Sequence, residues 1–143
     1  MTDVLVDTNV LLDVLAKREP FFADAAEIWT LCEDGGLRGH VSVISFNNIF
    51  YIVRKLSGKK EAQAMLEMLR GVFAPVALDA QLLHQAIGAK FADFEDAVQY
   101  HSALRVGAAC LVTRNVSHFP RSSLLVLSPG EFLAARAAKG SFT

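Results

Sequence analysis

Three short segments of this 143-residue chain, residues 4–6, 110–112 and 124–127, are apolar at every position. A strand with one face in water alternates apolar and polar side chains, whereas a strand of a parallel sheet is buried on both faces and shows a continuous apolar run. Segments with apolar residues at helical spacing lie between these runs. The alternation predicts an α/β fold in which right-handed βαβ crossovers place helices on both faces of a mostly parallel sheet.

Cap and turn residues indicate the remaining elements. Ser45 is a predicted N-cap that separates a strand at 40–44 from a helix ending at Gly58. The last helix begins with a cap residue, Ser128, followed by a proline at the first helical position and a glutamate three residues after the cap. Further helices are predicted over 20–34, 59–71, 80–88 and 93–107, and FAPVALD at 73–79 is a predicted strand whose Asp79 can cap the helix at 80–88.

The composition is that of one ordinary globular domain spanning 1–143. Hydrophobic residues make up 52% and charged residues 20% of the chain, and no apolar run approaches the roughly 20 residues needed to cross a bilayer. The N-terminus has no basic segment followed by an apolar one, so we expect a cytoplasmic protein without a membrane anchor. The formal net charge of −1 provides no general attraction to nucleic acid, so a polyanionic substrate would need a local basic patch or a metal ion.

The first apolar run stops at an acid, Asp7, and Thr8 and Asn9 follow it at the start of a helical pattern. In an open α/β sheet, ligands bind at the edge formed by the carboxyl ends of the strands. Asp7 is therefore placed where chemistry would be carried out. The same carboxylate could serve only to cap the following helix, and this short stretch does not distinguish the two roles.

Polar residues gather at four places where a predicted strand ends or a helix begins, namely 7–9, 45–48, 93–96 and 113–115. The carboxyl ends of parallel strands share one edge of a sheet, so all four groups can lie there. The sequence thus predicts one polar site built from segments far apart in the chain.

The acids near this edge are expected to differ in role. Asp93 and Asp96 are three residues apart, which puts both carboxylates on the same side of the first helical turn. Asp96 is followed by residues that look largely buried, so we expect it to need a partner. For Glu95 we expect only a favourable interaction with the helix dipole, worth about 0.3–1 kcal/mol. Asp13, six residues after Asp7, is expected to be solvated.

Asp7, Asp93 and Asp96 would repel one another if they met without a cation. Two unit charges about 4 Å apart interact with about 4 kcal/mol at an effective dielectric of about 20, so a proton or a metal must be shared. Carboxylates with Asn and Thr oxygens, and no His or Cys among them, suit a hard ion such as Mg²⁺ or Mn²⁺. Water bound to such an ion can attack a phosphate, so the group indicates metal-assisted hydrolysis of phosphodiesters.

With these residues in place, the chain resembles PIN domains of the kind found in bacterial VapC-type toxins. Four segments carry the resemblance in the family's order and span nearly the whole chain: VLVDTNVLLDVL at the N-terminus, then DFEDAVQYHSAL, LVTRNVSHF and SPGEF. The resemblance implies a three-layer α/β/α sandwich and a Mg²⁺- or Mn²⁺-dependent endoribonuclease that a cognate antitoxin holds inactive. The antitoxin would lie in an apolar groove between the helices of residues 20–34 and 46–57. PIN domains commonly dimerise, so we also expect a homodimer.

The family's functional positions can be carried over by their place in these motifs. Asp7 matches the first acid and Asp96 the third, and both would ligate the metal directly or through water. Asp93 matches the additional acid of a D-x-x-D-A subgroup. The family's second acid, usually Glu, is matched by Asn48, and its fourth position, Asp or Asn, is matched by Asn115.

The chain departs from the family pattern at Asn48 and at His118, which stands where a later aspartate is often seen. Fewer negative charges should weaken metal binding. A second interpretation is therefore a degenerate PIN fold that binds RNA or a protein partner without catalysis. A phosphotransfer enzyme with Asp7 as nucleophile, as in haloacid-dehalogenase-like phosphatases, is less favoured because that family has a second Asp where this chain has Asn9.

Unpaired RNA is the expected substrate, because phosphodiesters in single strands and loops are more accessible than those in a duplex. Arg114 flanks Asn115 at the strand-end edge, where a guanidinium could hold a phosphate. Thr113 and Ser45 could hydrogen-bond the acids or a phosphate, and are about equally well explained as cap or turn residues.

Overall fold

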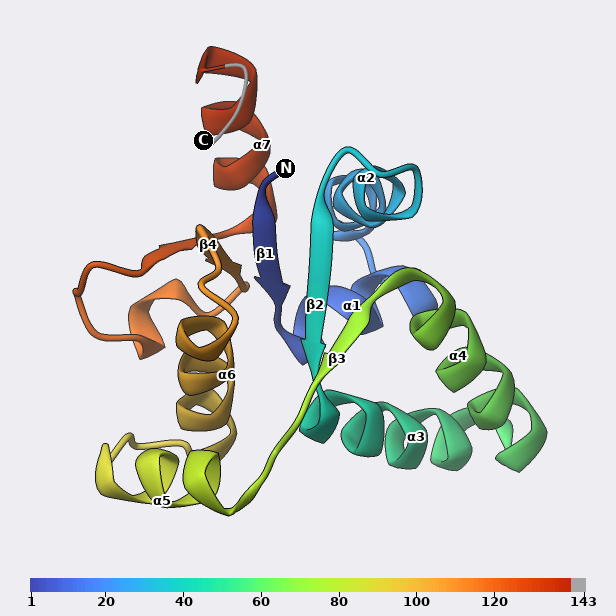
Figure 1. Ribbon diagram of the computed structural model, residues 1–143. Helices are drawn as coiled ribbons and strands as arrows, with labels where there is room; N and C mark the ends of the chain where they lie inside the picture. The colour runs from blue at the N-terminus through green and yellow to red at the C-terminus, as the bar shows by residue number, and fades with distance from the viewer. Residues whose placement is uncertain (140–143) are drawn as a thin grey trace.

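The computed structural model describes residues 1–139, and of Lys139 only the backbone. In chain order the elements are β1 (Asp3–Val6), α1 (Thr8–Leu15), α2 (Phe22–Glu33), β2 (Arg38–Ser42), α3 (Val43–Ser57), α4 (Lys59–Val72), β3 (Ala74–Val76), α5 (Ala80–Gly88), α6 (Phe94–Arg105), β4 (Cys110–Val112), the 3-10 turn η1 (Val116–His118), β5 (Leu125–Leu127) and α7 (Pro129–Lys139) (Figure 1). None of the helices in this range combines the length and apolar character needed to cross a membrane.

The five strands form one sheet in the order β3-β2-β1-β4-β5, and every neighbouring pair is parallel. The predicted α/β fold with a parallel central sheet is therefore confirmed. Because all strands run in the same direction, their carboxyl ends lie along one edge of the sheet, and β1 and β4 bring theirs together at its centre.

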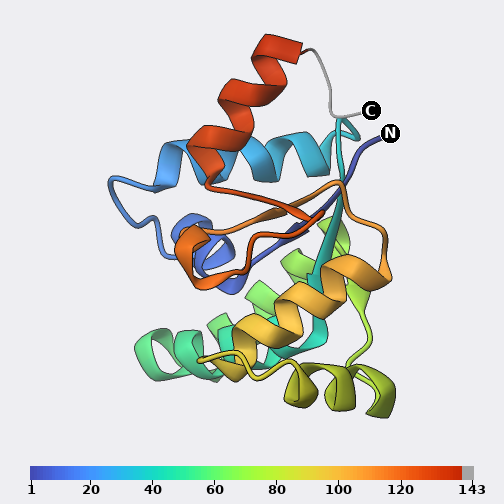
Figure 2. The same ribbon diagram turned by 90° about the vertical axis from the view of Figure 1, so that its left-hand side faces the viewer.

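The central strands are buried on both faces, as their continuous apolar sequences predict. Val4 and Val6 pack into the larger core, together with residues of α1, α2, α3, α4 and α7, whereas Leu5 packs into a second core with residues of α6. Figure 2 shows α2 and α7 on one side of the sheet and α6 with α5 on the other. The alternation of side chains along β1 thus produces the three α/β/α layers.

Several helix starts follow the predicted caps. Asp79 accepts a hydrogen bond from the backbone N–H of Leu82 at the start of α5. At the start of α7, Ser128 and Glu131 form a reciprocal pair in which each side chain accepts from the other's backbone N–H, at 3.2 and 2.9 Å. These contacts confirm that local capping chemistry sets these boundaries.

The boundary between β2 and α3 differs from the prediction. The strand ends at Ser42 rather than at residue 44, and the Ser42 hydroxyl caps α3 by accepting from the backbone N–H of Ile44 at 3.3 Å. Ser45, the predicted N-cap, lies inside the first turn of α3 and is fully buried. Both serines suit a cap by sequence, and the packing of α3 on the sheet selects the earlier one.

Candidate functional site

A hollow of about 250 Å³ opens at the carboxyl edge of the sheet, beside the ends of β1 and β4. We call it the acid hollow. Its polar and charged lining residues come from α1 with its two flanks, α6 with its N-cap, and the segment after β4: Asp7, Thr8, Asn9, Arg18, Asp93, Glu95, Asp96, Asn115 and His118. Residues up to 111 positions apart in sequence are thus brought together, as the placement of polar groups at strand ends predicts.

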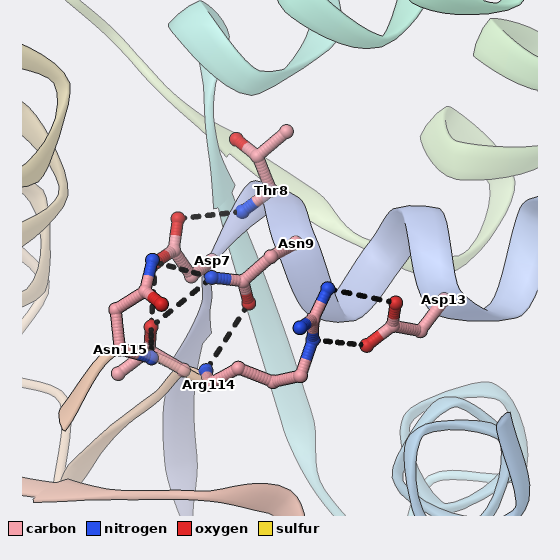
Figure 3. Close-up of polar contacts among 7 residues, drawn as sticks. Asp7, Thr8, Asn9, Asp13, Arg114 and Asn115 are labelled. Atoms are coloured by element: carbon pink, nitrogen blue, oxygen red, sulfur yellow. Dashed lines mark hydrogen bonds and ion pairs between the residues drawn. The ribbon is translucent and has the colours of Figure 1, made fainter. Parts of the chain in front are cut away.

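Asp7 lies at the centre of this arrangement and caps α1. Its Oδ1 accepts from the backbone N–H of Thr8 at 2.7 Å, and its Oδ2 accepts from the hydroxyl of Thr113 at 2.7 Å (Figure 3). The carboxylate is buried, and burial raises its pKa to about 6 although both hydrogen bonds act to lower it. The charges of Glu95 and Asp96 raise this pKa further. The helix cap that the sequence left open for Asp7 is thus observed, and the same carboxylate is also buried at the edge where ligands bind.

Asp96 is the second buried acid of the hollow. Burial and the charge of Asp93 raise its pKa, and His118 opposes this shift with Nδ1 at 3.3 Å from Asp96 Oδ2. Asp93 itself is exposed and caps α6, its Oδ1 accepting from the backbone N–H of Asp96 at 3.2 Å. The D-x-x-D spacing thus places one acid at the rim and one inside the hollow.

Thr113 orients Asp7 and is not open to solvent. The side chain is fully buried, its hydroxyl proton is donated to Asp7, and its oxygen accepts from the backbone N–H of Asn115 at 3.0 Å. This bond draws Asn115, which is half-buried and lines the hollow, to the same side as Asp7. Of the two roles considered for Thr113, the geometry supports contact with an acid rather than with a phosphate.

Four predicted site residues do not line the hollow, namely Ser45, Asn48, Thr113 and Arg114. Ser45 is fully buried and bonded to Thr8, so it has no surface to offer a phosphate. Asn48 is half-buried in the second turn of α3, and among the residues of α3 only Ile52 lines the hollow. In this structure α3 therefore contributes no ionisable side chain to the hollow.

Arg114 forms an ion pair with Asp13, a residue that was expected to be solvated. Asp13 is fully buried, and its carboxylate accepts from Arg114 Nε at 2.7 Å and from Arg114 Nη2 at 3.2 Å (Figure 3). The guanidinium also stacks 4.0 Å from the centre of the Phe21 ring. The expectation for Asp13 was wrong because the partner that neutralises it lies 101 residues away in sequence. A guanidinium held in this way has little capacity left for a phosphate.

Sequence reasoning missed two lining residues of the hollow. Glu95, assigned only to the helix dipole, is half-buried and accepts a hydrogen bond from the Thr8 hydroxyl at 2.7 Å. Arg18 also lines the hollow, and its side chain forms no hydrogen bond or ion pair with any residue in 1–139. The available signal was the run DFED, in which Glu95 stands between two acids already assigned to the edge.

The chemistry of the donors allows a test of whether the hollow suits a metal ion. Within residues 1–139, no three His, Cys, Asp or Glu side chains are arranged to ligate one ion together. Mg²⁺, however, is usually bound through one or two carboxylates and keeps several waters. Asp7 and Asp96, with Asn115 lining the same hollow, fit such a partly hydrated hard cation, which would supply positive charge to two carboxylates whose pKa values are raised mainly by burial.

Comparison with known proteins places this geometry in a family. Among solved structures, DNA-bound VapBC from Salmonella typhimurium has 20% sequence identity and a TM-score of 0.70, with 90% of this chain and 99% of that chain covered. VapC20 from Mycobacterium tuberculosis, described as a sarcin-ricin loop cleaving toxin, has 15% identity and a TM-score of 0.67, covering 85% and 98%. VapBC2 from Rickettsia felis, bound to a DNA fragment from its promoter, has 18% identity and a TM-score of 0.65, covering 89% and 98%.

At these identities the structural likeness shows a shared fold. A comparison with curated proteins finds no match. The sequence pattern of the family described as PIN domain matches residues 3–117, which is most of the chain. This protein is therefore a member of the PIN-domain family.

Proposed function

We propose that this protein is a metal-dependent endoribonuclease that hydrolyses phosphodiester bonds in single-stranded or loop RNA. One observation carries the proposal: Asp7 and Asp96 are two buried acids with raised pKa values that share one hollow, and neither forms an ion pair with a lysine or arginine in residues 1–139. An acid in a structural ion pair is already neutralised by its partner. A buried acid without such a partner can still bind a cation.

The residues of the hollow suit the roles that this reaction requires. Asp7 and Asp96 would hold Mg²⁺ or Mn²⁺ through their carboxylates, with Asn115 and the rim acid Asp93 assisting. Such an ion, when bound, supplies an activated water and stabilises the negative charge that develops on the phosphate. Thr113 fixes the orientation of Asp7 by donating its hydroxyl proton, so that the carboxylate is preorganised for binding.

Unpaired RNA is the proposed substrate, because its phosphodiesters can enter an open hollow more easily than those of a duplex. The description of the similar M. tuberculosis protein as a toxin that cleaves the sarcin-ricin loop supports this class of substrate. We also propose that the protein acts in the cytoplasm as the toxin of a toxin-antitoxin pair. Growth arrest on induced expression, absent in an Asp96→Asn variant, is the measurement that tests the toxin assignment.

The proposed partners are a cognate antitoxin and a second copy of the chain. The likeness to VapBC complexes supports the antitoxin. The exposed apolar side chains of Phe21, beside α2, and of Tyr51 and Leu56, on α3, support a contact along the two predicted helices. Light scattering of the purified chain tests the homodimer, which a monomeric mass would contradict.

The decisive experiment is cleavage of a mixed single-stranded RNA by the purified chain with Mn²⁺, with Mg²⁺ and with EDTA. We expect cleavage only with a metal, and a loss of about a hundredfold or more in the Asp96→Asn variant, because several kcal/mol of charge stabilisation would be removed. Asp34→Asn, which changes an exposed acid just after α2, is the matched control and should keep full activity.

A degenerate PIN fold that binds RNA or a protein without cutting is the second candidate. The contact of His118 with Asp96 favours it, and so does the lack of any acid among the α3 residues that line the hollow, since both leave less negative charge for a metal. A folded protein that cuts no RNA under any of the three conditions would contradict the nuclease and favour this alternative.

A further inference from the structure

Every carboxylate in the acid hollow comes from the N-cap of α1 or from α6 with its N-cap. α3, which forms another side of the hollow, contributes only the apolar side chain of Ile52. The charge facing a bound cation therefore depends on the two buried acids, on Asp93 at the rim and on Glu95 of α6.

Glu95 of α6 is held in place by Thr8, the first residue of α1. Thr8 donates its hydroxyl proton to Glu95 Oε2 at 2.7 Å and its backbone N–H to Asp7 Oδ1 at 2.7 Å. One residue thus fastens two carboxylates, one at the N-cap of α1 and one on α6, beside each other in the hollow.

The hydrogen bonds behind Thr8 have a defined direction. The single hydroxyl proton of Thr8 is given to Glu95, so in the 2.7 Å contact between the Thr8 and Ser45 hydroxyls, Ser45 is the donor. The Ser45 oxygen in turn accepts from Gln99 Nε2 at 2.9 Å. Ser45 and Gln99 are fully buried, so this chain of donors ends on the Glu95 carboxylate and fixes its position.

Glu95 and Asp96 are neighbours in the first turn of α6, and both line the hollow together with Asp7. A further carboxylate at the same hollow adds negative charge that favours a cation held by the other two.

We propose that Glu95 is a further acid of the cation site, held by Thr8, that strengthens binding of Mg²⁺ or Mn²⁺ by Asp7 and Asp96. It acts on the ion by charge and through bound water, since three carboxylates do not converge on one point. This inference rests on the metal dependence in the proposed function and assigns to Glu95 a role beyond the helix dipole.

The test is titration of the purified, RNA-free chain with Mn²⁺ alone by isothermal calorimetry. In Glu95→Gln the amide oxygen can still accept from Thr8, so the change removes the charge and leaves the hydrogen bond. We expect the dissociation constant for Mn²⁺ to rise about fivefold or more, the effect of losing one unit charge near a divalent ion in a partly solvated site. Glu95→Asp keeps the charge and should fall between Glu95→Gln and the unsubstituted chain.

Glu33→Gln, at the exposed C-terminal end of α2, is the matched control for charge and should bind Mn²⁺ as the unsubstituted chain does. Circular dichroism of each variant verifies the fold. Unchanged Mn²⁺ affinity in a folded Glu95→Gln variant overturns the role of Glu95 and leaves the proposed nuclease intact. Mn²⁺ binding that weakens in Glu95→Gln, in a chain that cuts no RNA, supports Glu95 and rejects the nuclease. A chain that binds no Mn²⁺ overturns both.

Discussion

Asp7 is the N-cap of α1 and Asp13 lies near the C-terminal end of the same helix. Both are buried, yet only one of the two charges is compensated by a cation. Asp13 accepts two hydrogen bonds from the guanidinium of Arg114. Asp7 receives only neutral donors, namely a backbone N–H, the hydroxyl of Thr113 and, at 3.4 Å, the amide of Asn9. A cation therefore compensates one acid, whereas burial raises the pKa of the other to about 6.

The difference separates an acid that is neutralised within the protein from one that we propose as a ligand of the metal. The pair of Asp13 and Arg114 fastens α1 to the segment that follows β4, and the backbone N–H of Arg114 also donates to Asn9 Oδ1 at 3.2 Å. Thr113 and Asn115, which flank Arg114 in sequence, are the residues that meet Asp7 from that segment. The compensated acid thus helps to hold the walls of the hollow that the uncompensated acid lines.

The largest effect is expected from breaking the compensated pair. Asp13→Ala leaves the Arg114 guanidinium, which is only 27% exposed, without its carboxylate, and should lower the free energy of unfolding by about 3 kcal/mol. Urea unfolding followed by circular dichroism measures this loss. The double variant Asp13→Leu/Arg114→Met removes both charges and should recover much of it. An Asp13→Ala variant with the urea midpoint of the unsubstituted chain would show that the pair is not structural.

The next effect comes from the uncompensated acid and depends on pH. The pKa of Asp7 lies at about 6 in the folded protein and at the ordinary value of 3.8 when unfolded, so the folded state binds more protons between these values. Stability from this group is therefore full below about pH 4 and is lost as pH rises through about 6, a change of roughly 2–3 kcal/mol.

Asp7→Asn removes this dependence because an amide does not titrate. The quantity of interest is the free energy of unfolding of Asp7→Asn minus that of the unsubstituted chain. In EDTA, this difference should be about 2 kcal/mol more positive at pH 7 than at pH 4. Urea unfolding of both chains at the two pH values provides the comparison. If this difference stays constant from pH 4 to pH 7, folding does not raise the pKa of Asp7.

The smallest effect concerns two arginines near the two acids. Arg114 is engaged by Asp13, whereas Arg18 lines the acid hollow and has no side-chain partner in residues 1–139. If the protein binds RNA as proposed, Arg18→Ala should weaken binding about threefold to tenfold and reduce the slope of log affinity against log salt by about 0.7, as expected for one phosphate contact on a single strand.

Fluorescence anisotropy with a labelled single-stranded RNA measures this effect, in an Asp96→Asn background that prevents cleavage. Arg70→Ala removes the same charge from α4, outside the hollow, and should change the affinity by less than twofold. Equal losses from the two substitutions would indicate attraction by general charge rather than a contact at the site.

Much of the fold could be predicted because the signals are local. The apolar run of β1, the Asp79 cap and the reciprocal pair of Ser128 and Glu131 each depend on residues within a few positions of one another. The start of α3 could not be predicted in the same way, because Ser42 and Ser45 are both suitable caps and only packing places Ser45 inside the helix.

The sequence alone determined that Asp7, Asp93, Asp96 and Asn115 would meet at one edge, because parallel strands bring their carboxyl ends together whatever the detailed packing. Only the tertiary structure decided which acids keep their charge available. Arg114 neutralises Asp13 across 101 residues, and Thr8 places Glu95 in the hollow across 87 residues. The pKa of a carboxylate depends on burial and on charges within a few ångströms, and no pattern of nearby sequence records which distant side chains will be those neighbours.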